Sequence, residues 1–373
     1  MTRPAIPLFK VAMSEAAPKM VAEVLRSGYV GQGQRVEDFE TALRAYFNWS
    51  QINTLNSATS GLELAVRMTQ RVSSGEILTT PLTCTATNFA ILAAGLRLRW
   101  VDVNPTTGNM DLADLEIKIG PKAQAVMVVH WGGYPCDLDR LLALQMNYLS
   151  QYARFVPIIE DCAHAWGAKY KGKLLGTHGN PSIFSFQAIK HLTTGDGGCI
   201  ISPNEAHYRR AKLLRWYGLD RESSADFRCS QDVKEWGFKF HMNDIAAAIG
   251  IANLMSVSER VNAHKANGRY YYTHLEGVPG LTLMEDLPDR ESSFWVFTLR
   301  VERREDFVRK MAEKGIAVSQ VHARNDKHSC LKEFRCHLPG MDVLEKEMIC
   351  IPCGWWLTPE DLEYIVANIK GGW

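Results

Sequence analysis

Lys190 is the first residue in this sequence whose type and surroundings suggest chemistry. It lies in the stretch IFSFQAIKHLTTGDGGCII (183–201), after an alternating apolar run and before a cluster of threonines and glycines, with no neighbouring acid to pair with. A lysine kept near apolar residues can have a lowered pKa and become a nucleophilic amine. We therefore treat Lys190 as a candidate nucleophile.

Two carboxylates end another apolar run, in the sequence VPIIEDCAHAWGA. Glu160 and Asp161 follow a predicted buried strand, at the edge of the sheet where active sites collect. Taken alone, Asp161 is equally well interpreted as the cap of a helix. An Asp and a Lys at the ends of successive strands are what an aldehyde cofactor with a basic ring nitrogen requires. The lysine forms the Schiff base, and the carboxylate keeps the ring protonated so that it acts as an electron sink.

The stretch NSATSGLELAV (56–66) offers a place for a cofactor phosphate. Small hydroxyl-bearing residues open a predicted helix there, and the amide N–H groups and dipole of a helix N-terminus suit an anion. Plain helix capping by the same residues is a common alternative. The lysine, the carboxylate and the helix together are more specific than any one of them.

A sheet has to position these residues. Apolar runs of strand length alternate with segments of helical spacing, which predicts an α/β fold with a mostly parallel sheet covered by helices on both faces. From about residue 245 a long helical region is followed by strand-like and helical segments, which indicates a smaller α+β lobe. We therefore expect a large domain over 1–245 and a small C-terminal domain over 246–373. The predicted strands of the large domain cover 76–80, 98–103, 125–130, 155–161, 182–186 and 198–202.

Composition argues against several other classes of protein. The 373 residues carry 42 Lys+Arg against 41 Asp+Glu, a formal charge of +1 without charged blocks, so we expect neither nucleic acid nor a membrane as partner. No window approaches a spanning helix and the N-terminus lacks the apolar core of a signal peptide, which predicts a cytoplasmic protein. The nine scattered cysteines predict reduced thiols. We expect no metal, although Cys350, Cys353 and the segment 328–337 contain metal-ligand residue types.

In their order along the chain, these motifs resemble the DegT/StrS-type sugar aminotransferases, which are pyridoxal-phosphate enzymes of the aspartate aminotransferase fold, fold type I. The resemblance implies a seven-stranded type of sheet and pyridoxal 5'-phosphate as cofactor. It covers nearly the whole chain, through the segments 27–40, 56–66, 80–92, 101–115, 129–141, 160–201, 237–250 and 314–322.

Carried over by position, the resemblance makes Lys190 the lysine that bonds to the cofactor aldehyde and Asp161 the partner of the pyridine nitrogen. Ala163 is expected to pack against the ring face, and His164 to lie near the ring hydroxyl. The sequence TTGDGG after the lysine then becomes a tight turn rather than a phosphate loop. The phosphate is expected to be bound by Ser57, Ala58, Thr59 and Ser185.

Several positions depart from the family pattern. Cys84 stands where many members have an aromatic residue stacked on the cofactor ring, so ring stacking should be weaker or different here. Lys239 stands where many members have an Asn that reaches the cofactor phosphate of the neighbouring subunit, and its ammonium can act there by charge, which implies an active homodimer. His322 is an expected substrate contact, and the cluster ARNDKH that follows it is unusual. We expect Arg324 and Lys327 either to bind a substrate carboxylate or phosphate or to lie on a solvated loop.

The resemblance implies transfer of an amino group from L-glutamate to a keto sugar, usually one linked to a nucleotide diphosphate, for surface polysaccharides such as lipopolysaccharide O-antigen or for other amino sugars. One alternative keeps the transaminase but changes the acceptor to a small phosphorylated ketone or keto acid, motivated by the ARNDKH cluster. A sugar dehydratase, which in a close branch has histidine in place of the lysine, and an inactive regulatory relative are further alternatives. The presence of both Asp161 and Lys190 argues against these two.

Overall fold

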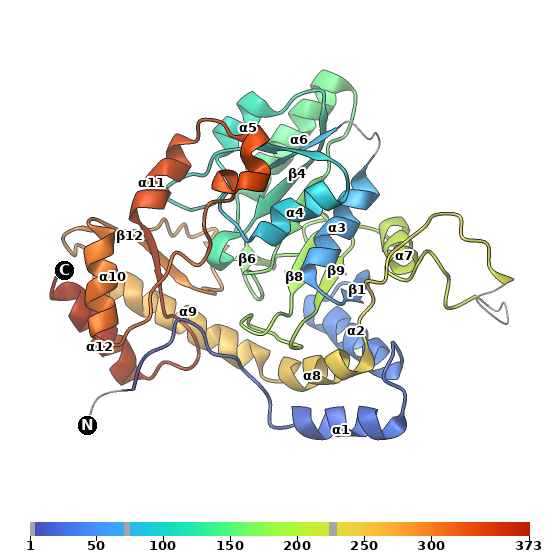
Figure 1. Cartoon of the computed structure of the whole chain (residues 1–373), viewed down its shortest axis with the longest axis horizontal. Helices are drawn as coiled ribbons and strands as arrows, with labels where there is room; N and C mark the ends of the chain where they lie inside the picture. The colour runs from blue at the N-terminus through green and yellow to red at the C-terminus, as the bar shows by residue number, and fades with distance from the viewer. Residues whose placement is uncertain (1–3, 71–74, 224–229) are drawn as a thin grey trace.

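A seven-stranded sheet forms the centre of the molecule in the computed structural model, which describes residues 4–70, 75–223 and 230–373 (Figure 1). Neighbouring strands are parallel except at β9, which runs antiparallel to both β1 and β8. The prediction of a mostly parallel sheet is therefore confirmed. The strand order is β1 (Ile52–Leu55), β9 (Gly198–Ile201), β8 (Ser182–Ser185), β5 (Ile158–Asp161), β4 (Ala123–Val129), β2 (Glu76–Thr79) and β3 (Arg97–Trp100).

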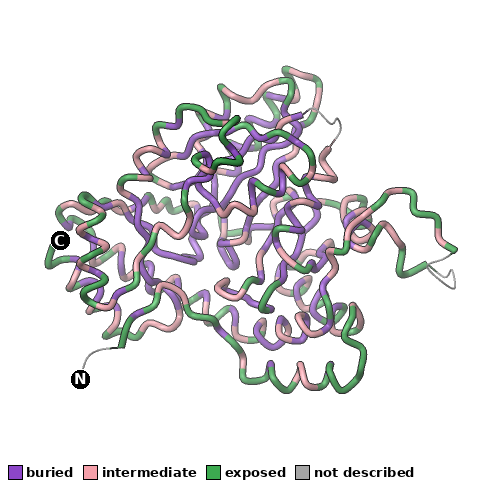
Figure 2. The backbone as a smooth tube through the Cα atoms, viewed as in Figure 1, coloured by how far each residue is buried: buried purple, intermediate pink, exposed green. Residues whose placement is uncertain are grey.

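Helices cover both faces of this sheet because alternate residues along each strand point to opposite sides. In β4, Val126 and Val128 belong to one apolar core, while Ala125 and Met127 belong to another. The buried backbone is accordingly concentrated in the sheet (Figure 2). Within the described residues, no helix combines the length and apolar content needed to cross a membrane. The first core is covered by α2 (Gln34–Phe47), α5 (Leu112–Lys118), α6 (Leu138–Tyr152) and α8 (Asp244–Leu254), and the second by α3 (Ala58–Thr69), α4 (Thr85–Ala93), α7 (Glu205–Leu214) and α11 (Pro339–Glu347).

The C-terminal part forms a second sheet with its own core. This sheet is antiparallel, in the order β10 (Leu281–Leu283), β12 (Phe297–Val301) and β13 (Met348–Ile351). The other end of the chain joins it, because Ile6 pairs with Ile316 through the backbone and is buried in the same core. Figure 1 accordingly shows both termini on this side of the molecule. The helices around this core are α9 (Val257–Leu275), α10 (Arg304–Glu313) and α12 (Pro359–Lys370).

The two parts meet near residue 255. Helix α8 ends at Leu254 and α9 begins at Val257, so the single long helical region expected from the sequence is in fact two helices. Helix α8 packs on α1 (Ala17–Ser27) and α2, whereas α9 contributes to the C-terminal core. The expected domain boundary at 245/246 falls in the first turn of α8. A short sheet also links the two parts, with strands β6 (Lys169–Tyr170), β7 (Lys173–Leu174) and β11 (Arg290–Glu291).

Candidate active site

A cavity of about 470 Å³ lies at the carboxyl ends of β4, β5 and β8. The last residues of these strands, Val129, Asp161 and Ser185, line it. The N-terminal end of α3, the residue before α4 and the segment between β8 and β9 complete much of its wall. The cavity thereby brings together these residues singled out from the sequence: Ser57, Ala58, Thr59, Cys84, Asp161, Ala163, His164, Ser185, Lys190 and His322.

Lys190 lines this cavity from the segment between β8 and β9. Its Nζ lies 3.6 Å from the ring centroid of Trp295, and among the described residues no carboxylate forms an ion pair with it. Burial lowers the pKa of Lys190 to about 7, although the negative charge of Asp161 acts in the opposite direction. A substantial part of the amine is therefore neutral at neutral pH, and the neutral amine is the nucleophilic form.

The TTGDGG sequence after Lys190 is a tight turn, as predicted. The N–H of Phe186 donates to the carbonyl of Gly197 over 2.9 Å, which closes the loop that contains the lysine. Gly195 has a φ of +85°, in the left-handed region that favours glycine. Gly198 permits a close approach of two backbones, because a Cβ there would lie 2.7 Å from the backbone nitrogen of Ala58. The turn thus returns the chain as β9, directly beside the start of α3.

Asp161 is buried, and each of its carboxylate oxygens accepts a hydrogen bond. The hydroxyl of Thr87 donates to Oδ2 over 2.7 Å, and the backbone N–H of Ala163 donates to Oδ1 over 3.0 Å. The Thr83 hydroxyl lies 2.8 Å from that of Thr87 and extends this network. Burial raises the pKa of Asp161, while these hydrogen bonds act to lower it. No helix begins after Asp161, so its alternative interpretation as a helix cap is wrong.

The N-terminus of α3 reaches the cavity next to the end of β8. Ser57 caps this helix, because its Oγ accepts a hydrogen bond from the backbone N–H of Ser60 over 3.0 Å. Ser57 therefore both caps the helix and lines the cavity. Ala58 and Thr59, the first residues of the helix, line the cavity together with Ser185. Helix N–H groups and hydroxyls gathered in this way suit a phosphate.

Two imidazoles line the cavity with a ring nitrogen that has no partner. His164 stacks on Trp295, with 3.8 Å between centroids, and its Nδ1 is buried without a hydrogen bond. The Nε2 of His322 is likewise buried and unpaired. Burial lowers the pKa of His164 well below its usual value and that of His322 to about 4, and the charge of Lys190 acts in the same direction. Both rings are therefore neutral and can each hydrogen-bond a group bound in the cavity.

These features together fit pyridoxal 5'-phosphate. Lys190 offers an amine for its aldehyde, Asp161 a carboxylate for its ring nitrogen, and the start of α3 a site for its phosphate. The unpaired Nδ1 of His164 lacks a partner that a ring hydroxyl would supply. The cavity therefore contains a complementary group for each polar part of the cofactor.

Cys84 and Lys239, the two residues that differ from the family pattern, lie in different surroundings. Cys84 immediately precedes α4 and lines the cavity, so a thiol does occupy part of its wall. Lys239 does not line the cavity of its own chain, and its side chain is exposed. It lies on the segment between α7 and α8, where its backbone pairs with that of Trp216. Its predicted contact with a phosphate across a subunit interface stays a prediction.

Arg324 and Lys327 also lie outside this cavity and line a second one of about 190 Å³, and the contacts of Arg324 contradict its expected role. Arg324 is buried, and its guanidinium makes a two-pronged contact with Asp326 at 2.8 and 2.7 Å. It also binds Asp342 at 2.5 Å and Glu345 at 3.0 Å, and Lys327 binds Glu345 at 2.6 Å. The predicted two-pronged contact of Arg324 with a substrate anion is wrong, because carboxylates of this chain already accept hydrogen bonds from its guanidinium. The alternative of a solvated loop is also wrong for Arg324.

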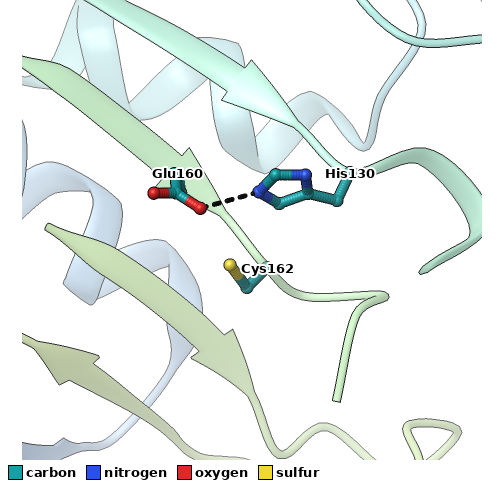
Figure 3. Close-up of side chains that lie close together, drawn as sticks. All are labelled: His130, Glu160 and Cys162. Carbon is teal, nitrogen blue, oxygen red and sulfur yellow. Dashed lines mark hydrogen bonds and ion pairs between the residues drawn. The ribbon is translucent and has the colours of Figure 1, made fainter. Parts of the chain in front are cut away.

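His130, Glu160 and Cys162 form a fully buried cluster of metal-ligand residue types at the ends of β4 and β5 (Figure 3). The backbone N–H of Cys136 donates to Nδ1 of His130 over 3.0 Å. Nε2 therefore carries the proton of the neutral ring and donates it to Glu160 over 3.0 Å. Asn180 donates to the other oxygen of Glu160. A metal would need the lone pair of Nε2, so this geometry favours a structural link between the strand ends, not a metal centre.

The cysteine-containing segments noted in the sequence are dispersed. Cys350 lies 3.5 Å from the Thr298 hydroxyl, and the Cys353 thiol donates to a backbone carbonyl, both within the interior. Cys330 and Cys336 are exposed. Within the described residues, these thiols form no metal-binding group, and the buried pair contributes to packing.

Several residues of the cavity were not identified from the sequence. Trp295 precedes β12, and Phe9 from the N-terminal segment stacks on it at 4.8 Å between centroids. Thr87 donates to Asp161 although the two residues are 74 positions apart. Apolar and hydroxyl residues of this kind have no local signature of function, because only the fold brings them to the cavity.

Comparison with known proteins identifies the family of this chain. Residues 12–370 match the DegT/DnrJ/EryC1/StrS aminotransferase family. The structure superposes on AtS13 from Actinomadura melliaura with a TM-score of 0.97 and 50% identity, over 100% of both chains. The sugar aminotransferase CalS13 from Micromonospora echinospora gives a TM-score of 0.96 at 45% identity, over 99% of this chain and 100% of the other.

Two further relatives bear on the chemistry. The UDP-4-amino-4,6-dideoxy-N-acetyl-beta-L-altrosamine transaminase of Campylobacter jejuni is 28% identical over 92% of this chain and 91% of its own. A putative sugar aminotransferase from Streptococcus pneumoniae is 25% identical, with a TM-score of 0.89 over 98% of both chains, and is known in a PLP form and a PMP form. The chain belongs to the DegT/DnrJ/EryC1/StrS aminotransferase family and is a pyridoxal-phosphate-dependent aminotransferase.

Proposed function

We propose that this aminotransferase moves an amino group from L-glutamate to a keto sugar carried on a nucleotide diphosphate, in a pathway that makes amino sugars for surface polysaccharides. The observation that carries the proposal is the convergence of Lys190, Asp161 and the N-terminus of α3 on one cavity. The Campylobacter relative, whose name specifies a UDP-linked amino sugar, supports the class of acceptor.

Each residue has a distinct part in this reaction. When bound, pyridoxal phosphate supplies an aldehyde for the amine and a ring that stabilises negative charge at the substrate carbon. Asp161, fixed by Thr87 and Ala163, keeps the proton on the ring nitrogen. Lys190 would offer its amine to that aldehyde and, when its amine is free, would move the proton at the substrate Cα. Its pKa of about 7 suits both removal and return of that proton near neutral pH.

The remaining groups orient the reactants. The hydroxyls and N–H groups of Ser57, Thr59 and Ser185 would hold the phosphate, while Asp161 would hold the ring nitrogen. His164 accepts or donates a hydrogen bond at the ring hydroxyl through its unpaired Nδ1. His322 remains the proposed contact for the substrate, because its Nε2 is unpaired in the same cavity. Cys84 leaves one wall without an aromatic ring.

The proposed active unit is a homodimer in which Lys239 reaches the cofactor phosphate of the partner. Its exposure and its absence from its own cavity support a role across subunits. Mixing Lys190→Ala with Lys239→Ala subunits tests this arrangement. If Lys239 acts across the interface, a mixed dimer contains one site with both lysines intact and regains activity. If it acts within its own subunit, every site of the mixed dimer lacks one lysine and no activity returns.

A small phosphorylated acceptor is not favoured by the contacts around the cavity. That alternative rested on Arg324 and Lys327, which are held by carboxylates outside it. The acceptor is therefore expected to be recognised through its sugar and nucleotide parts. Its nucleotide, and the carbon that receives the amine, have to be found by assay.

The decisive experiment follows both half-reactions on the purified protein loaded with pyridoxal phosphate. L-Glutamate should convert the absorption band of the lysine-bound cofactor to that of its aminated form and release 2-oxoglutarate. Nucleotide-linked keto sugars should then restore the first band, whereas small phosphorylated ketones and keto acids should not. Failure of glutamate to release 2-oxoglutarate would exclude the donor, and recovery only with small ketones would exclude the proposed acceptor.

A further inference from the structure

We propose that Trp295 is a positioning residue that holds the protonated amine of Lys190 on its indole face whenever that amine is not bonded to the cofactor. This inference rests on the proposed role of Lys190 and assigns a part to a residue outside the cofactor-binding set. The carrying observation is the position of the Lys190 Nζ, 3.6 Å from the ring centroid of Trp295. An ammonium in that position is attracted by the negative face of the indole, and most strongly where water is excluded.

The indole is fixed in place by contacts that also fix the lysine. Its Nε1–H donates to the backbone carbonyl of Ile189, the residue before Lys190, over 2.9 Å. The backbone N–H of Trp295 donates to the carbonyl of Gly132 over 2.9 Å, which ties it to the end of β4. His164 and Phe9 both stack on the ring. Trp295 is 2% exposed, so the ring cannot turn without disrupting this packing.

The surroundings of the amine leave few other groups to hold its charge. Asp161 lies close enough to favour the charged form, but its oxygens already accept from Thr87 and Ala163. The thiol of Cys84 acts in the same direction. The neutral rings of His164, His322 and His191 offer no opposite charge. The indole face is therefore the direct contact of the ammonium.

This arrangement has a consequence for the reaction. For the proposed proton transfer, Lys190 would have to stay beside the substrate carbon while carrying a proton. A face that attracts the ammonium without accepting its proton keeps the side chain near that carbon and still lets the proton leave. A carboxylate in the same place would hold the charge more strongly and raise the pKa of the amine.

The test compares Trp295→Phe with Trp295→Leu. Both variants lose the Nε1–H bond to Ile189, but only Trp295→Phe keeps an aromatic ring. A difference in the pKa of Lys190 between the two variants therefore reports the effect of the aromatic face. The measurement is the rate at which Lys190 of the cofactor-free protein is acetylated by a short pulse of acetic anhydride, followed by peptide mass spectrometry across pH values on both sides of neutrality. Trp131→Phe is the matched control, because Trp131 is also buried and contacts His164 but not Lys190.

The expected result is a pKa of Lys190 about one unit lower in Trp295→Leu than in Trp295→Phe, which corresponds to a cation–π contact in a desolvated site. Trp131→Phe should leave the pKa as in the unmodified protein. Equal values in the Phe and Leu variants would overturn the inference. So would an equal shift in Trp131→Phe, because the effect would then come from general loosening of the cavity.

A second measurement separates this inference from the proposed function. The rate at which added pyridoxal phosphate becomes bonded to Lys190 is followed by absorbance in the same variants. If the unmodified protein never bonds the cofactor through Lys190, the proposed function fails, whatever the acetylation data show. If it does, and the Phe and Leu variants bond it with the same pH dependence as the unmodified protein, only the role of Trp295 fails.

Discussion

Lys190 and Arg324 are two cationic side chains near the same cavity, held in opposite ways. Lys190 lies over an aromatic ring and forms no ion pair with a carboxylate of the described residues, and burial lowers its pKa to about 7. Arg324 is buried among three carboxylates, whose hydrogen bonds outweigh burial and raise its pKa. The first environment favours loss of a proton and reactivity, and the second fixes a charge for structure. Burial alone therefore does not identify a functional cation, whereas its partners do.

The largest expected effect comes from removing the reactive member of this pair. Lys190→Ala should lower kcat by at least about 10⁴-fold, because both the bond to the cofactor and the proton transfer are lost. The folded protein should persist, since no ion pair is broken. Steady-state kinetics with thermal melting checks this prediction. A Lys190→Ala variant that keeps more than a few per cent of the activity would contradict the role of Lys190 as the reactive cation.

Asp161→Asn tests the charge that opposes Lys190 across the cavity. The amide keeps the shape of the side chain but cannot stabilise a proton on the ring nitrogen. We expect kcat to fall by about 10³-fold, in the range of a lost electrostatic contact in a buried site. Since Asp161 favours the charged form of Lys190, the pKa of the lysine should also fall. The pH dependence of Lys190 acetylation checks the second effect, and no change there would show that the two groups are uncoupled.

Arg324→Met tests the structural member of the pair. Removing the guanidinium leaves the buried carboxylate of Asp326 unpaired, which should lower the free energy of unfolding by about 3 kcal/mol. Lys327→Met is the control, because its exposed ammonium shares Glu345 and should cost at most about 0.5 kcal/mol. Denaturant unfolding measures both. If Arg324→Met instead raised KM for the acceptor without loss of stability, Arg324 would be a substrate ligand after all.

Thr87→Val removes one hydrogen bond to Asp161 with little change in shape. The lost donor should raise the pKa of Asp161 further and weaken cofactor binding by about tenfold, the size of one buried hydrogen bond to a charged group. Equilibrium titration with pyridoxal phosphate measures this. The same titration on Thr59→Val, which removes a hydroxyl at the phosphate end, shows whether the loss is specific to the ring nitrogen.

The smallest effect is a pH dependence without any mutation. Because the amine of Lys190 must be neutral to bond to the cofactor and burial lowers its pKa to about 7, the initial rate of bonding should rise with pH through neutrality and then level off. The lowered pKa also means that the unfolded chain binds more protons than the folded one from about 7 up to the usual value for lysine. In the cofactor-free protein this group therefore makes stability rise with pH over that window. A bonding rate that rises only at strongly basic pH would make Lys190 an ordinary exposed lysine.

Much of the fold could be predicted because the strands are buried on both faces. The six predicted strands correspond to β2, β3, β4, β5, β8 and β9. Strand β1 was not identified, since Asn53 and Thr54 interrupt its short apolar run. Remote contacts accommodate these polar residues, because the Asn53 amide donates to the carbonyl of Tyr208 and Thr54 donates to Glu40. The reversed direction of β9 was not predicted either, because side chains alternate in the same way in parallel and antiparallel strands.

The candidate site was predictable where a motif is local and not where contacts are remote. Lys190, Asp161 and the start of α3 each have a recognisable sequence context. Arg324 was misinterpreted because two of its partners, Asp342 and Glu345, follow 18 and 21 residues later. Trp295 was read only as part of a strand, since nothing in its neighbourhood indicates that a lysine 105 positions earlier packs on it.

The most direct test of the account is to load the protein with pyridoxal phosphate, reduce the linkage with borohydride and locate the modified lysine by peptide mass spectrometry. The account predicts that Lys190 alone carries the cofactor, and that Lys190→Ala leaves the protein unlabelled. Labelling of another lysine, or equal labelling of the variant, would contradict the assignment of this cavity as the active site.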